Sequence, residues 1–392
     1  MHQILAKLRS QAWWNRRFIL LSEFVGHALL SHRKRGTENN QPRHIGLIVL
    51  HQIGDMALAT PTITAIRQMF PSAHLTIIAG TGPAQLISTN PWDADVITFD
   101  AIWQPVVRRF TQRQTDIMSA RRAFQEVIFS LHADILLAFQ PDRIVNQLMV
   151  GAAPRTVGFS DAGGGFFLTN PLPDQGCSFD HQIEINYLLA RELGQIYQVA
   201  VPVRPPAQLM IIPKAITSIN HRRESATTNK KIAIFHPYPS DPKRAWASSH
   251  WQEIAQWFIK QHVTPIVIGG SNDHFASWPQ GTLDWTGTLS LPETLALLAQ
   301  ASIVVAIDSG PGHLAAAVGT PVVSIFSATN DPKKWAPFGP KVTTLLPPPS
   351  KTWEGIPYED RKLATGTQIN PYTEGITVST VIEAIRHYLD QR

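Results

Sequence analysis

The chain has 392 residues, 44% of them hydrophobic and 16% charged, and because this length exceeds what one hydrophobic core usually supports, we expect two domains. Its single cysteine, Cys177, excludes a disulfide framework and a cysteine-based zinc site and favours a cytosolic protein. The net charge of +5 favours acidic partners such as phosphorylated glycolipids or anionic membranes, while no dense basic run with interleaved aromatics indicates a nucleic-acid groove.

Residues 1–40 are predicted to form a basic, amphipathic N-terminal helical extension. Residues 1–36 contain seven lysines and arginines but only one acid, Glu23, and several aromatic and aliphatic residues lie among them. The longest apolar run is four residues, far short of the roughly 20 needed to span a bilayer, and no signal-peptide core follows the first charges. The segment could lie in a membrane interface, pack on a neighbouring domain or be disordered.

The next segment alternates strands and helices, which predicts a mainly parallel sheet in an α/β domain over residues 41–205. His44–Leu50 is a buried strand, a turn with Gly54 follows, and the helix over Ala57–Met69 stops before Pro71. The remaining predicted strands are Leu75–Ala79, Ile135–Phe139 and Arg155–Phe159, and Glu184–Leu193 is a helix.

A proline-rich and polar stretch over residues 206–230 predicts an interdomain passage, after which the alternation restarts in a second domain over residues 231–372. Its predicted strands are Lys231–Phe235, Thr264–Ile268, Ile303–Ile307 and Pro321–Phe326, and its helices are Trp251–Gln261, Leu291–Gln300 and Gly312–Val318. A final helix is expected within residues 373–392. In open α/β sheets ligands bind at the carboxyl ends of strands, so the loops after Leu50, Phe235, Ile268 and Ile307 are the candidates.

The loop after Ile307 reads Asp308-Ser309-Gly310-Pro311-Gly312-His313 and runs directly into an apolar helix. Strand, glycine-rich turn and helix together place backbone N–H groups and the positive end of a helix dipole at one point, which favours a diphosphate. Gly310 and Gly312 would let a phosphate approach closely, and Asp308 and His313 could contact sugar hydroxyls. The alternative is an ordinary capped helix, because Asp and Ser are good N-caps.

Three other loops carry weaker signals. Asp55, at the end of a strand, could take a proton from an acceptor hydroxyl or could be a helix N-cap. Lys243 and Arg244 could balance the charge of a diphosphate leaving group or form a solvated basic turn. Gly269-Gly270 followed by Asp273 suggests a nucleotide-contacting loop. The histidines show no metal-binding spacing, so no metal is expected.

Four segments together resemble glycosyltransferase family 9, the bacterial lipopolysaccharide heptosyltransferases, from about residue 44 to the C-terminus. They are IGLIVLHQIGDMALATPTITAIRQMFPSAHLTIIAG from Ile45, HADILLAFQPDRIVNQLMVGAAPRTVGF from His132, HQIEINYLLARELG from His181, and IVVAIDSGPGHLAAAVGTPVVSIFSATNDPKKWAPFGP from Ile303. One segment departs from the family pattern: family members usually read K-R-W-P, whereas this chain reads PKRAW and Trp246 is displaced by one position.

The resemblance implies a GT-B fold, in which two Rossmann-like domains face a central cleft and the final helix crosses back to the first domain. It also implies an inverting, metal-independent transfer from ADP-heptose without a cofactor. Asp55 would be the general base and Lys243 the phosphate-neutralising lysine. The donor side would comprise Lys243, Arg244, Gly269, Gly270, Asp273, Asp308, Ser309, Gly310, Gly312 and His313, and the acceptor side Gly54, Thr60, Gln140 and Arg143.

The expected function is therefore sugar transfer from a nucleotide donor onto a lipopolysaccharide core or related bacterial surface glycan. The expected location is the cytoplasm, with peripheral contact to the inner membrane through residues 1–36. Two alternatives stay open. One is a nucleotide-sugar epimerase, and the other is a non-catalytic nucleotide-sugar or glycan-binding protein of a polysaccharide assembly system.

Overall fold

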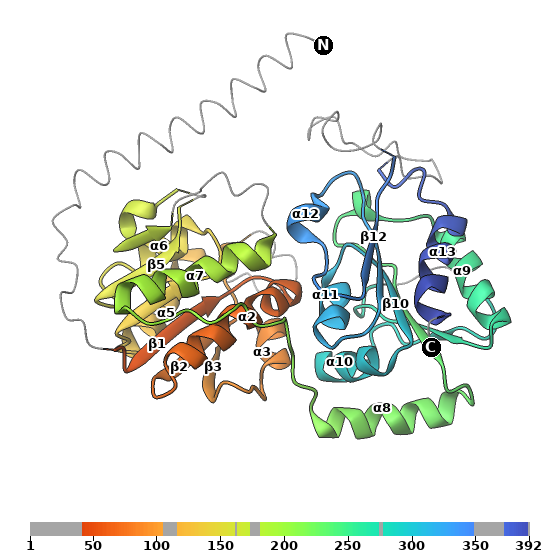
Figure 1. The fold of residues 1–392 in the computed structure, drawn as a ribbon, viewed down its shortest axis with the longest axis horizontal. Helices are drawn as coiled ribbons and strands as arrows, with labels where there is room; N and C mark the ends of the chain where they lie inside the picture. Colours follow the sequence, from red (N-terminus) through yellow and green to blue (C-terminus); the bar gives the residue numbers. More distant parts are fainter. Residues whose placement is uncertain are drawn as a thin grey trace, which may run out of the picture.

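The computed structural model describes residues 41–104, 116–160, 163–172, 181–273, 277–348 and 372–390, so the predicted N-terminal extension lies outside the described residues. Two α/β domains lie side by side, each built on its own sheet (Figure 1). Both sheets have six strands, in the orders β3-β2-β1-β4-β5-β6 and β12-β11-β10-β7-β8-β9. Every neighbouring pair in both sheets is parallel. The predicted α/β architecture of two Rossmann-like domains is confirmed.

The elements follow the alternation expected from the sequence. The first domain contains β1 (His44–Val49), α2 (Ile53–Met69), β2 (His74–Ala79), α3 (Thr81–Leu86), β3 (Ala94–Thr98), α5 (Ile117–Ser130), β4 (Ile135–Ala138), α6 (Arg143–Leu148), β5 (Arg155–Phe159), the 3₁₀ turn η1 (Gly165–Phe167), β6 (Asn170–Leu172) and α7 (Gln182–Tyr197). The central strands β1 and β4 are buried along almost their whole length, because helices cover both faces of a parallel sheet.

The second domain begins after a passage that contains a helix, α8 (Pro213–Ala226). The domain contains β7 (Ile232–His236), the 3₁₀ turn η3 (Pro242–Arg244), α9 (Ser248–Lys260), β8 (Thr264–Val267), β9 (Leu283–Asp284), α10 (Leu291–Gln300), β10 (Ile303–Ile307), α11 (Gly310–Ala317), β11 (Val322–Ile325), α12 (Pro332–Trp335), β12 (Val342–Leu345) and α13 (Val378–Leu389). The predicted passage is therefore partly helical. Helix α8 packs against α10 of the second domain.

Helix α2 accommodates a proline in its interior. Pro61 has no N–H to donate to the carbonyl of Ala57, four residues earlier. The hydroxyl of Thr60 donates to that carbonyl instead, at 2.8 Å. The helix therefore continues to Met69, and its first turn faces the second domain.

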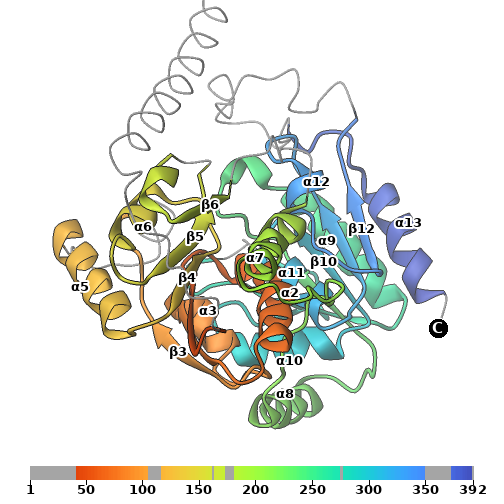
Figure 2. The ribbon, with the colours of Figure 1, turned by 60° about the vertical axis from the view of Figure 1, so that its left-hand side comes forward.

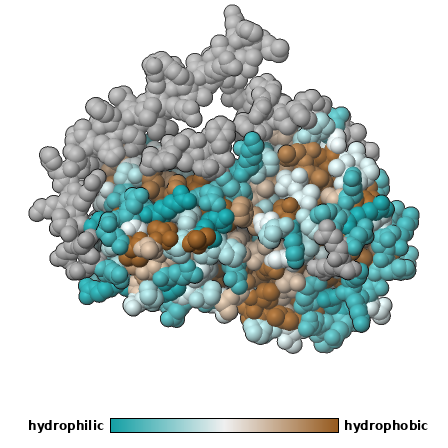
Figure 3. All heavy atoms as spheres, in the orientation of Figure 1, coloured by the Kyte–Doolittle hydropathy of each residue, from teal (hydrophilic) through white to brown (hydrophobic). Residues whose placement is uncertain are grey.

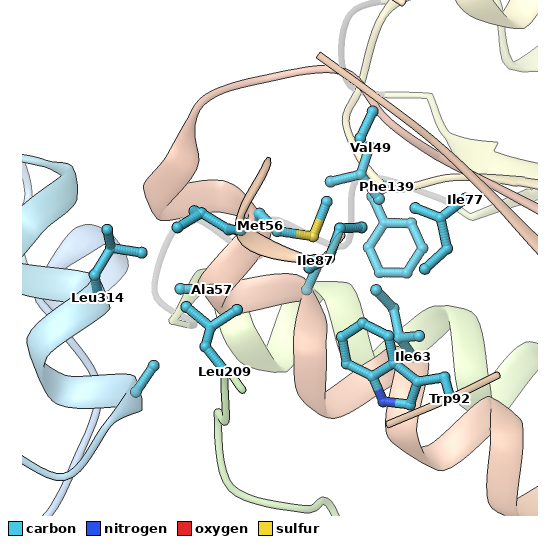
Figure 4. Packing of buried hydrophobic residues seen from close by; sticks show 14 of the residues in the cluster. Val49, Met56, Ala57, Ile63, Ile77, Ile87, Trp92, Phe139, Leu209 and Leu314 are labelled. Carbon is cyan, nitrogen blue, oxygen red and sulfur yellow. The ribbon is translucent and has the colours of Figure 1, made fainter. Parts of the chain in front are cut away.

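The hydrophobic core continues from one domain into the other. Figure 4 shows Leu314 of α11 across from Met56 and Ala57 of α2, and Leu209 of the interdomain passage belongs to the same cluster. Helices α2, α7 and α11 pack together in this region (Figure 2). On the surface, apolar residues gather near the junction of the two domains (Figure 3). The buried contact sets the position of the first turn of α2 relative to the first turn of α11.

The final helix does not lie where the resemblance placed it. Among the described residues, α13 packs against α9, β10 and β11 of the second domain. Val381 and Ile385 are buried in that domain's core, and the hydroxyl of Tyr388 is 2.9 Å from that of Thr343 on β12. The prediction that this helix crosses back to the first domain is therefore wrong.

None of the helices in the described part of the chain combines the length and apolar character that a membrane crossing requires.

Candidate active site

The predicted donor loop lies at the carboxyl end of β10 and forms the start of α11. Ser309 is the N-cap residue, but its hydroxyl does not cap the helix. It lies 3.0 Å from the carbonyl oxygen of Ile307 and 2.8 Å from Nδ1 of His236. Because no described side chain caps α11, its first turn keeps the polarity of an uncapped N-terminus, which suits an anionic ligand.

His236 is the last residue of β7, next to the donor loop. Burial lowers the pKa of its imidazole to about 4, so the ring is neutral at physiological pH. Ser309 can donate its one proton to Ile307, in which case Nδ1–H of His236 donates to the Ser309 hydroxyl. The pair fixes the chain direction where strand β10 turns into α11.

Asp308 is held by two partners. Its side chain is 5% exposed, with Oδ2 3.2 Å from Nη1 of Arg244 and 2.7 Å from Nδ2 of Asn330. Burial raises the pKa of the Asp308 carboxyl, and the charge of Arg244 acts in the opposite direction. Both contacts are made by Oδ2, so the second carboxylate oxygen is placed to accept a hydrogen bond from a ligand hydroxyl.

The first turns of α2 and α11 meet at the domain interface. A Cβ atom on Gly54 would lie 3.1 Å from Cδ2 of His313 and 3.6 Å from Cα of Gly310. A Cβ atom on Gly310 would overlap the side chain of Ile53. Two helix N-termini, each carrying partial positive charge, therefore converge on one point between the domains.

Asp55 is the third residue of α2, and Gln52 is the N-cap residue. The carboxylate of Asp55 accepts the backbone N–H of Gln52 at 3.0 Å. Burial raises the pKa of this carboxyl, while His51 and the bond from Gln52 lower it. The alternative that Asp55 is the N-cap residue is therefore wrong. Asp55 helps to cap the helix from its third position, through the N–H of Gln52. A carboxylate with a raised pKa beside the other domain's donor loop is suited to accepting a proton.

His313 is also buried in this junction. Burial lowers the pKa of its imidazole to about 4, and His181 adds to the effect. The Nδ1 atom is buried and has no hydrogen-bond partner among the described residues. Because buried polar atoms are nearly always paired, this nitrogen is a candidate contact for a bound ligand.

Lys243 and Arg244 lie on η3, which follows β7 and is capped by the carboxylate of Asp241. Arg244 reaches the donor loop through Asp308, so the structure brings the basic turn and the donor loop together. The guanidinium Nε of Arg244 is buried without a hydrogen-bond partner among the described residues. The predicted solvated basic turn therefore does not describe Arg244.

The glycine pair after β8 lies against Tyr238. A Cβ atom on Gly269 would come within 2.6 Å of the Tyr238 ring, so only glycine fits there. Asp273 accepts the backbone N–H of Gly270 at 2.7 Å, so this carboxylate first serves to close its own loop. Tyr238 is buried and its hydroxyl is 3.5 Å from that of Thr286.

Several predicted site residues have structural surroundings instead. Thr60 is fully buried, donates to Ala57 and accepts the backbone N–H of Gln208 at 3.1 Å. This placement is inconsistent with the acceptor contact predicted for it. Gly312 packs closely within the second domain, because a Cβ there would lie 3.2 Å from Cγ of Pro337. Its lack of a side chain serves packing within the second domain.

The other two acceptor-side residues lie together near the end of β4. Gln140 follows that strand and is 8% exposed. Arg143 is exposed and is the first residue of α6, whose N-cap is Asp142. Both lie in the first domain, at the carboxyl edge of the sheet that also positions Asp55.

Sequence reasoning missed His236, Asn330 and Tyr238. His236 is the last residue of the buried strand β7, directly before the loop that leads to Lys243, and this position was a usable signal. Asn330 lies 22 residues after Asp308, and nothing in the spacing indicates that the two side chains meet. They meet because β11 is parallel to β10, so the loops after both strands lie at one edge of the sheet.

Two surface hollows in the second domain lie away from these residues. One, of about 660 Å³, lies between β12 and α13. The other, of about 570 Å³, lies beside Trp246 and the start of α13. Neither is lined by Asp55, Asp308 or His313, so size alone does not mark the reactive centre. Among the described residues no group of three or more His, Cys, Asp or Glu is arranged to hold a metal ion.

Comparison with known proteins decides the family. The model for "Glycosyltransferase family 9 (heptosyltransferase)" matches residues 156–354. The chain belongs to glycosyltransferase family 9. This family 9 glycosyltransferase is 48% identical over 302 residues to lipopolysaccharide heptosyltransferase 3 of Escherichia coli K12, covering 73% of this chain and 82% of the relative. It is 21% identical over 317 residues to the lipopolysaccharide core heptosyltransferase OpsX of Haemophilus influenzae, covering 76% and 82%.

Solved structures of family 9 members share its fold. A family 9 glycosyltransferase from Veillonella parvula superposes with a TM-score of 0.72 at 18% identity, covering 89% of this chain and 98% of that one. The ADP-heptose lipopolysaccharide heptosyltransferase II of E. coli superposes with a TM-score of 0.70 at 17% identity, covering 89% and 99%. The GT-B arrangement expected for a family 9 glycosyltransferase is thereby confirmed.

Proposed function

We propose that this glycosyltransferase moves a heptose from ADP-heptose onto the core of lipopolysaccharide, with inversion at the anomeric carbon and without a metal ion. One observation supports the mechanism. The N-terminus of α2, which bears Asp55, meets the N-terminus of α11, which is formed by the donor loop, at the domain junction. The substrate class is supported by the 48% identical relative, whose name describes a lipopolysaccharide heptosyltransferase.

Asp55 acts as the general base in this proposal. Its carboxylate takes the proton of the acceptor hydroxyl as the hydroxyl oxygen forms a bond to the anomeric carbon. The bond between that carbon and the diphosphate oxygen breaks on the opposite face, and ADP leaves with the electron pair. The raised pKa of the Asp55 carboxyl makes it a stronger base than an exposed aspartate.

The leaving diphosphate is stabilised by charges that the protein holds in place. The first turn of α11 presents partial positive charge without a described side-chain cap. Lys243, on the turn next to Arg244, supplies a full positive charge, and Arg244 itself keeps Asp308 oriented. Fixed dipoles and cations can stabilise developing negative charge without Mg²⁺.

The sugar ring contacts Asp308 and His313. The unpaired Nδ1 of His313 accepts or donates a hydrogen bond at a sugar hydroxyl, according to its tautomer. Asp308 offers a carboxylate already oriented by Arg244 and Asn330. Because both side chains are buried, each is fixed before the donor binds, which reduces the cost of ordering on binding.

A transfer assay tests the proposal directly. The full-length protein is incubated with ADP-heptose and a heptose-deficient lipopolysaccharide core in EDTA, and the product is followed by mass spectrometry and its anomeric configuration by NMR. We expect a mass gain of one heptose, release of ADP and an inverted anomeric centre. Conversion of the donor without acceptor would indicate an epimerase, and binding without turnover a non-catalytic protein.

The basic segment of residues 1–36 holds the enzyme near the membrane surface in this proposal, because its charge complements anionic lipid. Sedimentation with anionic vesicles compares the full-length protein with a form that lacks residues 1–36. We expect only the full-length protein to sediment, and equal sedimentation of both forms would refute this role.

A further inference from the structure

His181, the N-cap residue of α7, connects the two domains. Its Nδ1 accepts the backbone N–H of Ile183 at 3.2 Å, which leaves the ring proton on Nε2. That Nε2 donates to the carbonyl oxygen of Ala336, in the second domain, at 2.8 Å. The two hydrogen bonds use both ring nitrogens, so one side chain caps a helix of the first domain and binds the backbone of the second.

Phe338, two residues after Ala336, is held between His181 and Arg204. Its ring centroid lies 4.9 Å from that of His181, and the guanidinium of Arg204 lies 4.7 Å from the same ring. Arg204 lies after α7, just before the interdomain passage, and pairs with Glu184 of α7, with Nε and Oε1 2.7 Å apart. A cation over an aromatic ring is attractive when partly desolvated, and the Arg204 side chain is 20% exposed.

The same segment of α7 is also fixed to the helix that carries Asp55. Gln182 donates to the side-chain oxygen of Asn186 at 2.9 Å, and Asn186 donates to the carbonyl oxygen of Leu58 on α2 at 3.1 Å. All three groups are buried. Because a buried polar group that loses its partner is costly, this chain of hydrogen bonds ties the start of α7 to α2.

On the other side, the loop over residues 336–338 supports the donor loop. Pro337 lies against Gly312, with its Cγ 3.2 Å from the position that a Cβ would occupy. Gly312 precedes His313, whose pKa is lowered chiefly by burial and also by the nearby His181. The loop that accepts the His181 hydrogen bond therefore packs directly on the first turn of α11.

We propose that His181, Gln182, Glu184, Arg204 and Phe338 form an interdomain latch that sets the position of Asp55 relative to the donor loop. The latch explains why the segment HQIE from His181 has three polar side chains in one helical turn: each makes a different contact. His181 binds the backbone of the second domain, Gln182 binds Asn186 and through it α2, and Glu184 binds Arg204. These are positioning residues, and the inference rests on the proposed base role of Asp55.

The substitution His181→Asn separates the latch from helix capping. The asparagine oxygen occupies the place of Nδ1 and is itself a good N-cap, but the side chain ends too early to reach Ala336. We expect kcat to fall roughly tenfold or more, because small displacements of reacting groups are costly. The affinity for ADP should stay within about twofold of the wild-type value, because the substitution does not change the residues proposed to bind the nucleotide. Phe338→Leu, which leaves α7 untouched, should give the same pattern.

A distance measurement tests the latch without any turnover. Spin labels at Ser130→Cys and Lys260→Cys, in a Cys177→Ser background, place one probe on each domain at exposed positions. We expect His181→Asn and Phe338→Leu each to broaden or shift the distance distribution in the ADP-bound protein. The double variant should change it little further, because both act on one contact.

Arg191→Met is the matched control. Arg191 lies on the same helix, and its guanidinium is 5.9 Å from the ring of Tyr187 within the first domain. We expect wild-type kcat and an unchanged distance distribution. The latch is refuted if both His181→Asn and Phe338→Leu keep the wild-type distances. If the two variants alter the distances but the wild-type protein transfers no sugar, the result would support the latch and overturn the proposed function instead.

Discussion

The imidazole of His313 lies against the backbone of Gly54, close enough that a Cβ atom on Gly54 would be 3.1 Å from His313 Cδ2. Gly54 precedes the proposed base, and His313 ends the donor loop. The contact therefore joins the reactive parts of the two domains without an intervening side chain. A larger residue in place of Gly54 or Gly310 would separate the proposed base from the donor loop.

Replacing Asp55 with asparagine should abolish transfer without unfolding the protein. The amide oxygen can still accept the Gln52 N–H, and removal of a buried charge removes its desolvation cost. We expect kcat to fall by about 10²–10⁴-fold, the usual contribution of a general base, while calorimetry shows unchanged ADP binding. Asp116→Asn, at the N-cap of α5, is the control and should keep full activity. Unchanged turnover in Asp55→Asn would remove this residue from the base role.

The pH dependence of kcat/KM should reflect the environment of Asp55. A general base works in its deprotonated form, so activity is present above its pKa and is lost as the pH falls through it. Because burial raises the pKa of this carboxyl above its ordinary value of 3.8, we expect the acid limb above that value. Circular dichroism at each pH separates this limb from unfolding. A limb at or below 3.8 would contradict the assignment.

The folded state should lose stability in mildly acidic solution through His236. Burial lowers its pKa from 6.5 to about 4, so the unfolded chain binds more protons between these values and stability falls with the pH. At pH 5 the loss is about 2 kcal/mol relative to neutral pH. His236→Gln should remove this component, measured as the difference between the two proteins' urea unfolding free energies at pH 7 and pH 5. Buried carboxyls act in the opposite direction and cancel in that difference. An equal pH dependence in both proteins would show that His236 already titrates normally in the fold.

Arg244 and Asp308 should be energetically coupled. Arg244→Met leaves the Asp308 carboxylate buried with only Asn330 beside it, and we expect a loss of about 1–3 kcal/mol in unfolding free energy. The double variant Arg244→Met, Asp308→Asn should lose less than the sum of the two single variants. Urea unfolding of all four proteins gives the coupling, and additive losses would mean that the ion pair contributes no stability.

Gly310→Ala should disturb the domain junction specifically. The added Cβ would come within 2.4 Å of Ile53, so the side chain must reorient or the helices must separate. We expect roughly a tenfold loss of kcat, since reacting groups would be misplaced, and recovery in the double variant Gly310→Ala, Ile53→Ala.

Gly319→Ala is the control, because it also replaces a glycine of the second domain, just after the C-terminal end of α11. Gly319 has φ +79° and nothing within 4 Å of an added Cβ, so the substitution strains the backbone without touching the first domain. It should lower stability but leave kcat unchanged. A Gly310→Ala protein that remains slow in the presence of Ile53→Ala would show that the effect does not come from this contact.

The two α/β halves and the loops that carry the candidate chemistry could be predicted from the amino-acid sequence alone. Runs such as His44–Leu50 and Ile303–Ile307 are apolar because strands of a parallel sheet are covered on both faces, and that pattern is local. The loop from Asp308 to His313 was also recognisable, because an N-terminal helix turn after a strand has a local signature.

Which of these residues meet, and which have a structural role, became visible only in the folded protein. Thr60 is a buried partner of Ala57 rather than an acceptor contact, Gly312 is a packing position, and α13 stays on the second domain. The bond from His181 to Ala336 joins residues 155 positions apart. Contacts of this kind depend on how two separately folded sheets pack against each other, and no local pattern along the chain encodes that packing.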